Sequence, residues 1–252
     1  MKKIFVTTFN KKLFDEYAHS LIETYIQTKQ ILPLYCYVED DVGLYPKFEN
    51  VFFLNLFHEQ PESKNFINRN LKKQHELAES VYLLNAIRFS YKVFAQNDAR
   101  KYGDHIFYLD SDISFIKTIP ENWYNACLPE NVFLTLYERL GHHTEAGFLA
   151  FNNKLKNCKN TKISDIFFSI YLNFYKLDSI FCLPSFTDCH ALDATRYRML
   201  FLQPYVNEYN EYKEKKLGDS LCYVNRNFVD IMGEDRFTGE YFIHEKGYKK
   251  SN

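Results

Sequence analysis

Several features that mark special classes of protein are missing from this sequence of 252 residues. Its six cysteines form no Cys-x-x-Cys pair and no zinc-type spacing, which is typical of unpaired thiols in a reducing compartment. No stretch approaches the roughly 18 apolar residues of a membrane span. The apolar stretch near the N-terminus is too short for the apolar region of a signal peptide. We therefore expect a cytoplasmic protein without a transmembrane segment, with peripheral contact to a membrane left open.

An excess of charge of one sign is also missing, because the formal net charge is -1. Nothing global therefore indicates nucleic-acid binding, and we expect no nucleic-acid partner. The local basic cluster of Lys64, Arg69, Lys72 and Lys73 is expected to be a solvated helix face. The sequence contains no internal repeat and no low-complexity linker, so we expect a single domain over residues 1–252.

The pattern of apolar residues predicts an α/β fold. Residues 13–30 have apolar positions at the i, i+3, i+4 spacing of an amphipathic helix, and apolar runs lie on either side of them. A strand, a helix and a strand in succession indicate a βαβ unit and a mostly parallel sheet. The expected strands are 3–8, 32–38, 51–57, 106–109, 131–137 and 146–152, and the expected helices are 13–30, 76–94, a short one around Trp123, 163–177 and 187–202.

Residues 58–75 are polar and basic and show no apolar period. This pattern predicts a long mobile loop or a short helix over the functional site, because loops of that length are often functional. We expect such a segment to become protected from hydrogen exchange when a ligand binds.

Two aspartates, Asp110 and Asp112, follow the short apolar run 106–109. In an open α/β sheet, ligands bind at the carboxyl ends of the strands. Two carboxylates one residue apart at such an end are able to hold a hard divalent cation whose other ligands are water and phosphate oxygens. The pattern therefore indicates metal-bound phosphate chemistry, whereas ordinary turn residues are the simpler interpretation.

The order of these motifs resembles the GT-A nucleotide-sugar glycosyltransferases, and glycosyltransferase family 8 and its relatives most of all. The resemblance covers nearly the whole chain. It is carried by the βαβ start, the helix with Arg88, the Asp110-Ser111-Asp112 motif, the segment Thr144-Glu145-Ala146-Gly147-Phe148-Leu149-Ala150-Phe151-Asn152, and the C-terminal His244-x-x-Gly247-x-x-Lys250. It implies a GT-A, Rossmann-like fold, with residues 1–115 binding the nucleotide sugar and residues 116–252 binding the acceptor.

The resemblance also implies a metal site. Asp110, Asp112 and His244 would be the ligands of one Mn²⁺ or Mg²⁺ ion that bridges the donor diphosphate, and this mixed donor set suits Mn²⁺. Gly247 would let the backbone approach the phosphates, and Lys250 would stabilise the leaving diphosphate, with Lys246 and Lys249 as rival candidates. Taken alone, a histidine after an apolar strand is more often a packed or surface residue.

The donor site is implied in the same way. The residues after the first two strands, Thr7, Thr8, Phe9 and Asp40, lie where such folds hold the base and ribose, and ordinary turn chemistry is the alternative. Asp110, Ser111 and Arg88 would contact the sugar or the phosphates of the donor. For Arg88, the alternative is a side chain that only extends past its apolar neighbours to solvent. Uridine diphosphate is expected as the donor carrier ahead of guanosine diphosphate.

The acceptor, a glycan, a lipid-linked sugar or another hydroxyl compound, would bind near Glu145, Asp188 and His190. Glu145 stands where the family has Asn. Two roles for it stay open: a hydrogen bond to a sugar hydroxyl, or the capping of a strand. Asp188 is equally suited to capping a helix. The resemblance implies retention of anomeric configuration, and if the reaction inverts, the same three residues are the candidate general bases.

Two other functions stay open. In a haloacid-dehalogenase-like phosphatase, Asp110 and Asp112 would be nucleophile and acid/base, with Asp230 and Glu234 as the later acidic motif. Against it, that family's motif normally ends the first strand. The third candidate is a nucleotide-sugar-binding module without turnover.

Overall fold

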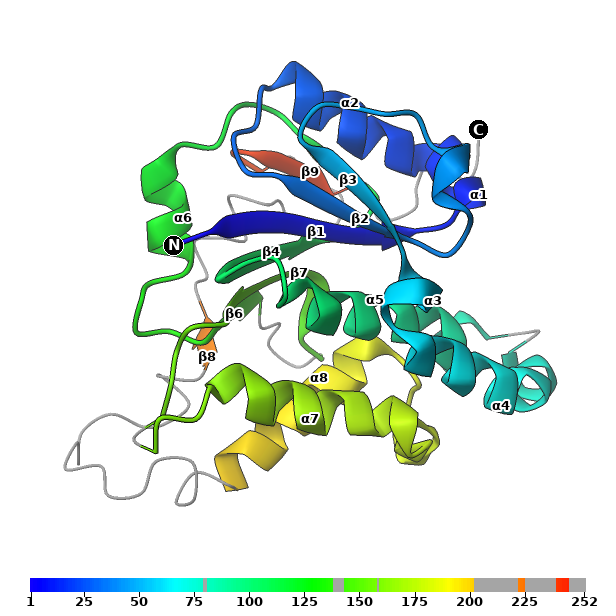
Figure 1. Cartoon of the computed structure of the whole chain (residues 1–252). Helices are drawn as coiled ribbons and strands as arrows, with labels where there is room; N and C mark the ends of the chain where they lie inside the picture. Colours follow the sequence, from blue (N-terminus) through cyan, green and yellow to red (C-terminus); the bar gives the residue numbers. More distant parts are fainter. Residues whose placement is uncertain (79–80, 138–142, 158, 202–221, 225–238, 245–252) are drawn as a thin grey trace.

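The computed structural model describes residues 1–78, 81–137, 143–157, 159–201, 222–224 and 239–244. It has a seven-stranded sheet in the order β3-β2-β1-β4-β7-β6-β8 and a two-stranded sheet of β5 and β9 (Figure 1). The strands are β1 Lys3–Phe9, β2 Leu34–Val38, β3 Val51–Asn55, β4 His105–Leu109, β5 Ile113–Phe115, β6 Leu134–Tyr137, β7 Glu145–Asn152, β8 Cys222–Val224 and β9 Phe242–His244. Strands β1 to β4 pair in parallel, and β7 is antiparallel to both β4 and β6. The predicted α/β class with a mostly parallel sheet is confirmed.

Helices cover both faces of the large sheet (Figure 1). They are α1 Lys11–Leu13, α2 His19–Gln27, α3 Leu56–Glu59, α4 Pro61–Ala78, α5 Ala86–Ala99, α6 Glu121–Cys127, α7 Ile163–Lys176 and α8 Asp188–Phe201, with the shorter turns η1 Phe14–Ala18, η2 Val42–Leu44, η3 Tyr82–Leu84 and η4 Ser179–Cys182. One apolar core lies between the sheet and α5, α7 and α8, and a second lies between the sheet and α2, α6 and β5. Alternate residues of β1 enter different cores: Ile4 and Val6 the first, Phe5 and Phe9 the second.

Residues 58–75 differ from the prediction, because most of them form the long helix α4. The buried positions of this helix are Ser63, Phe66, Asn70 and Gln74, which have helical spacing but are mostly polar. Asn70 donates to Asp178 Oδ1 at 2.7 Å, and Gln74 donates to the Leu84 carbonyl at 2.8 Å. The prediction of a loop or short helix over the site was wrong. The sequence shows no apolar period here because the helix buries amide side chains that form hydrogen bonds.

The expected helix 76–94 is interrupted. Helix α4 ends at Ala78, the turn η3 follows, and Asn85 caps α5 by accepting a hydrogen bond from the Arg88 amide at 3.0 Å. Because of this break, Tyr82 and Leu83 lie in the turn η3 between two α-helices and not within one continuous α-helix. The expected helix 13–30 is also divided, into α1, η1 and α2.

Other expectations concern the surface and the cysteines. All four residues of the basic cluster, Lys64, Arg69, Lys72 and Lys73, are exposed on α4, as predicted. The cysteines whose state is described, Cys36, Cys127, Cys182 and Cys189, are free thiols. Among the helices in the described ranges, none has the length and apolar character needed to cross a membrane.

Candidate functional site

The aspartate pair lies at the carboxyl edge of the large sheet. Strand β4 is fully buried between β1 and β7, and Asp110 follows its last residue. The Asp110 amide donates to the Gly147 carbonyl at 2.8 Å, and the Asp110 carbonyl accepts from the Ile113 amide at 3.2 Å. This tight turn leaves the Asp110 and Asp112 side chains partly exposed, by 18% and 19%, at the sheet edge.

His244 is brought to this turn from the far end of the sequence. Strand β9 pairs antiparallel with β5, and this register places His244 opposite Ile113, the residue after Asp112. His244 is buried, and its Nε2 lies 3.4 Å from Asp112 Oδ1. One ligand atom from each of Asp110, Asp112 and His244 lies within 4.8 Å of the other two. The structure therefore unites the three residues that the resemblance implied as metal ligands.

Gly147 makes room for this cluster. A Cβ atom added at Gly147 would lie 2.7 Å from His244 Cε1 and 3.1 Å from both Asp110 Oδ2 and Glu145 Oε1. A side chain of any size would thus displace the imidazole or a carboxylate. The space in which the three ligand side chains meet exists because this position of β7 is glycine.

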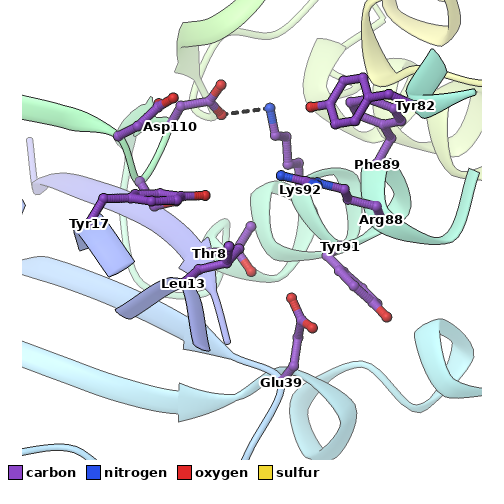
Figure 2. A pocket seen from close by; sticks show the side chains of 12 residues that line it. Thr8, Leu13, Tyr17, Glu39, Tyr82, Arg88, Phe89, Tyr91, Lys92 and Asp110 are labelled. Carbon is purple, nitrogen blue, oxygen red and sulfur yellow. Dashed lines mark ion pairs between the residues drawn. The ribbon is translucent and has the colours of Figure 1, made fainter. Parts of the chain in front are cut away.

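Lys92 also belongs to the site, and the sequence analysis did not identify it. Its Nζ lies 2.6 Å from Asp110 Oδ1 and 3.4 Å from Asp188 Oδ2, and Figure 2 shows it extending from α5 toward Asp110. Lys92 follows Arg88 by four residues, so both side chains lie on one face of α5. That spacing was the signal in the sequence that could have found it.

Burial and charge shift the protonation of these groups. Burial raises the pKa of Asp112 and lowers that of His244, but their mutual attraction outweighs both effects, so the Asp112 pKa falls below its usual value and the His244 pKa rises above its own. Burial raises the pKa of Asp110, with Lys92 offsetting part of the rise. Burial lowers the pKa of Lys92, but Asp110 and Asp188 raise it well above the ordinary value. The Lys92 ammonium thus offsets part of the negative charge of Asp110 and Asp188.

Two cavities meet at this cluster, and they share a wall that consists of Tyr17, Tyr82, Arg88, Phe89, Lys92, Asp110 and Asp112. The small cavity, of about 90 Å³, is completed by Thr8, Leu13, Glu39, Tyr91 and Ser111 (Figure 2). The large cavity, of about 440 Å³, is completed by Leu83, His143, Glu145, Thr187, Asp188, Cys189 and His244. Asp110 and Asp112 therefore line both cavities at the carboxyl edge of the sheet.

The residues predicted for the nucleoside are divided by strand alternation. Thr8 lines the small cavity, and its Oγ1 donates to the Tyr37 carbonyl at 2.9 Å. Thr7 and Phe9 are buried and line neither cavity, and Phe9 packs in the second core. Arg88 and Ser111 line the small cavity. Arg88 also lies over the Tyr82 ring, 4.9 Å from its centroid.

Asp40 has a structural role, and its neighbour Glu39 faces the cavity instead. The Asp40 carboxylate accepts hydrogen bonds from the Lys11 amide and, at 3.1 Å, from the Tyr45 hydroxyl, which fixes the start of α1. Glu39 lines the small cavity and accepts from Asn10 Nδ2 at 3.2 Å. Burial raises the pKa of Glu39 to about 7. Glu39 was not predicted, because the sequence does not reveal which of the acidic residues after β2 faces the site.

Two of the three residues predicted for catalysis, Glu145 and Asp188, line the large cavity. Glu145 lines it and accepts a hydrogen bond from the Gly147 amide at 3.0 Å. Asp188 also lines it, is almost fully buried, and accepts no hydrogen bond from the described residues, so the Lys92 ammonium is its charge partner. His190 does not line the cavity; its Nδ1 lies 2.9 Å from Thr187 Oγ1, and its ring lies 4.7 Å from that of His143.

The remaining predicted residues lie outside the described part of the chain. They are Gly247 and Lys250, the rival lysines Lys246 and Lys249, and the acidic residues Asp230 and Glu234 of the phosphatase alternative.

No known family model matches this sequence, and no curated protein matches it. Among solved structures, the chain is similar to mouse xyloside xylosyltransferase 1 in its apo form, with 10% identity, a TM-score of 0.47, and coverage of 89% of this chain and 85% of that one. It is also similar to the apo bifunctional glycosyltransferase WbbM, with 13% identity, a TM-score of 0.44, and coverage of 76% of this chain and 37% of that one. The functional assignment below therefore rests on the geometry of the site.

Proposed function

We propose that this protein is a metal-dependent glycosyltransferase that moves a sugar from a nucleotide-diphosphate donor to a hydroxyl acceptor. The observation that supports it best is the meeting of Asp110, Asp112 and His244 at the carboxyl edge of the sheet, where both aspartates line two cavities. Ligands bind at this edge in open α/β sheets. A donor and an acceptor need two adjoining spaces, and the two cavities supply them.

The three clustered side chains fit a divalent metal. Two carboxylates and one imidazole suit Mn²⁺, with Mg²⁺ as the harder alternative. Gly147 keeps the space between them open. When bound, the metal would act as a Lewis acid that stabilises negative charge on the departing diphosphate. Asp112 and His244 would hold the metal in their deprotonated forms, as metal ligands do.

The small cavity is the proposed place of the nucleoside. Thr8, Glu39 and Ser111 offer polar groups, and the rings of Tyr17 and Tyr91 line the same cavity. Arg88 and Lys92 on the shared wall would contact the diphosphate, since cations stabilise the charge that develops there. Following the family resemblance, uridine diphosphate is the first donor carrier to test, and guanosine diphosphate is the second.

The large cavity is the proposed place of the acceptor. In the transfer, the acceptor oxygen bonds to the anomeric carbon of the sugar, and the bond from that carbon to the diphosphate oxygen breaks, with its electron pair leaving on the diphosphate. The hydroxyl proton moves to a phosphate oxygen if the configuration is retained. If it is inverted, a carboxylate must take the proton, and Asp188 and Glu145 are the candidates beside the cavity.

A panel of nucleotide sugars tests this proposal. Thermal unfolding would be followed with uridine, guanosine, cytidine and adenosine diphosphate sugars, each with and without Mn²⁺, because a ligand that binds only the native state raises the melting temperature. We expect one nucleotide to stabilise the protein in the presence of Mn²⁺ and its sugar to be released slowly to water. No stabilisation by any nucleotide sugar with Mn²⁺ would contradict the proposal.

The same panel separates the two alternatives. Hydrolysis of simple phosphate esters through a covalent aspartyl phosphate on Asp110 would establish the phosphatase. Tight Mn²⁺-dependent nucleotide binding without release or transfer of any sugar would establish the binding module.

A further inference from the structure

An exposed apolar turn borders the large cavity. Val81, Tyr82 and Leu83 are 41%, 56% and 48% exposed, and they follow one another in the chain at η3. Tyr82 and Leu83 line the large cavity directly. Adjacent large apolar side chains left in water at the edge of a site indicate a surface that a ligand covers.

The turn is held firmly in place. The Leu83 carbonyl accepts hydrogen bonds from Ser185 Oγ and the Phe186 amide, both at 3.0 Å. Arg88 covers one face of the Tyr82 ring, and the Phe89 ring meets it edge-on with centroids 5.2 Å apart. A fixed aromatic ring loses little entropy when a ligand packs against it, so η3 is suited to be a binding platform.

The charges around the large cavity favour a neutral ligand. Glu145 and Asp188 place two carboxylates beside it, and Thr187 adds a hydroxyl. Among the described residues that line this cavity, the lysine and arginine side chains are Lys92, which is paired with Asp110 and Asp188, and Arg88, which lies over Tyr82. In the part of the chain that the structure describes, carboxylates outnumber cations in this lining, so a phosphate group on the acceptor would be repelled.

We propose, building on the glycosyl transfer proposed above, that the acceptor is a neutral sugar whose ring packs on Tyr82 and Leu83. One face of a pyranose ring presents C–H groups, which pack against apolar carbon and against the negative face of an aromatic ring. Its rim presents hydroxyls, which donate hydrogen bonds to the Glu145 carboxylate and the Thr187 hydroxyl. The sugar is thereby oriented with a hydroxyl toward the aspartate pair and the donor.

The experiment compares acceptors and one variant. With Mn²⁺ and the best donor of the panel, methyl glycosides of glucose, galactose, xylose and N-acetylglucosamine would be assayed beside phosphate monoesters of the same sugars. We expect at least one neutral glycoside to be used with a kcat/KM about tenfold or more above that of its phosphate ester. Preference for a phosphate ester would overturn the inference.

Leu83→Asn tests the platform, because this side chain lines only the large cavity and is half-exposed. We expect the acceptor KM to rise about tenfold, a larger change than in the donor KM. Leu83→Met should restore the acceptor KM, and Leu177→Asn, at a leucine that is 71% exposed and lines neither cavity, should leave it unchanged. An unchanged acceptor KM in Leu83→Asn would overturn the inference. Absence of sugar release from every donor in the wild-type protein would instead overturn the proposed function itself.

Discussion

The small and the large cavity share a wall but are built from different parts of the chain. The small cavity is completed by residues in β1, in α1, on α5, and just after β2 and β4, all in the first half of the sequence. The large cavity is completed by η3, β7, the start of α8, and β9 near the C-terminus. The small cavity therefore depends on residues at the ends of neighbouring strands. The large cavity forms only when segments distant in sequence come together. The charged residues of the shared wall connect the two.

Removing the cation from the shared wall should have the largest effect on stability. Lys92→Met leaves Asp110 and the buried Asp188 without their charge partner, which should destabilise the metal-free protein by about 3 kcal/mol. Because Mn²⁺ would restore the missing positive charge, we expect Mn²⁺ to raise the melting temperature of the variant more than that of the wild type.

Calorimetry or thermal unfolding with and without Mn²⁺ measures this difference. Lys154→Met, which breaks a surface pair with Asp104, is the matched control and should change stability little. If Mn²⁺ raised the melting temperature of Lys92→Met and of the wild type equally, Lys92 would not connect the two cavities.

Glu39 tests the small cavity alone. Its pKa of about 7 lies above the ordinary value of 4.5, so between these pH values the native state holds a proton that the unfolded state has lost. The stability from this group is complete below about pH 4.5 and is lost as the pH rises through about 7. Glu39→Gln should therefore be more stable than the wild type at pH 8 by on the order of 2 kcal/mol, and about equal to it at pH 4.5.

The measurement is urea unfolding at several pH values, with the exposed Glu23→Gln on α2 as the control. The same difference between Glu39→Gln and the wild type at every pH would show that Glu39 is not protonated in the native protein at neutral pH.

Gly147 tests the ligand cluster with a smaller expected effect. Gly147→Ala places a methyl group against His244 and Asp110, so the ligands must separate, and the Mn²⁺ affinity should fall about tenfold. Gly43→Ala is the matched control, because its new methyl group would meet only the Asp41 side chain at 3.3 Å. Wild-type Mn²⁺ affinity in Gly147→Ala would show that the cluster does not need this space.

The sequence predicted the structure best where the apolar or polar character of a residue decided whether it lies in a buried strand or just after one. Strands β1, β2 and β4 are mostly apolar and are followed by polar residues, and they were predicted within a few residues. Asp110 and Asp112 were placed correctly because they directly follow such a strand. The pairing of β5 with β9 brought His244 to them as the family resemblance implied.

Prediction failed where partners distant in sequence decided the outcome. Helix α4 buries Asn70 and Gln74 through hydrogen bonds to Asp178 and to the η3 and α5 backbone, and no apolar period reveals that. Asp40 rather than Glu39 was predicted for the nucleoside, because the hydrogen bond that the Lys11 amide donates to the Asp40 carboxylate joins residues distant in sequence. Lys92 was missed because its carboxylate partners come from β4 and α8.

The most direct test of the central claim is a titration of the nucleotide-free protein with Mn²⁺, followed by the electron paramagnetic resonance of the free ion. We expect one Mn²⁺ per chain, with affinity reduced about 100-fold or more in Asp112→Asn and His244→Ala. Asp104→Asn, at the opposite end of β4, should keep the wild-type affinity. Equal Mn²⁺ affinity in the wild type, Asp112→Asn and His244→Ala would contradict the proposed metal site.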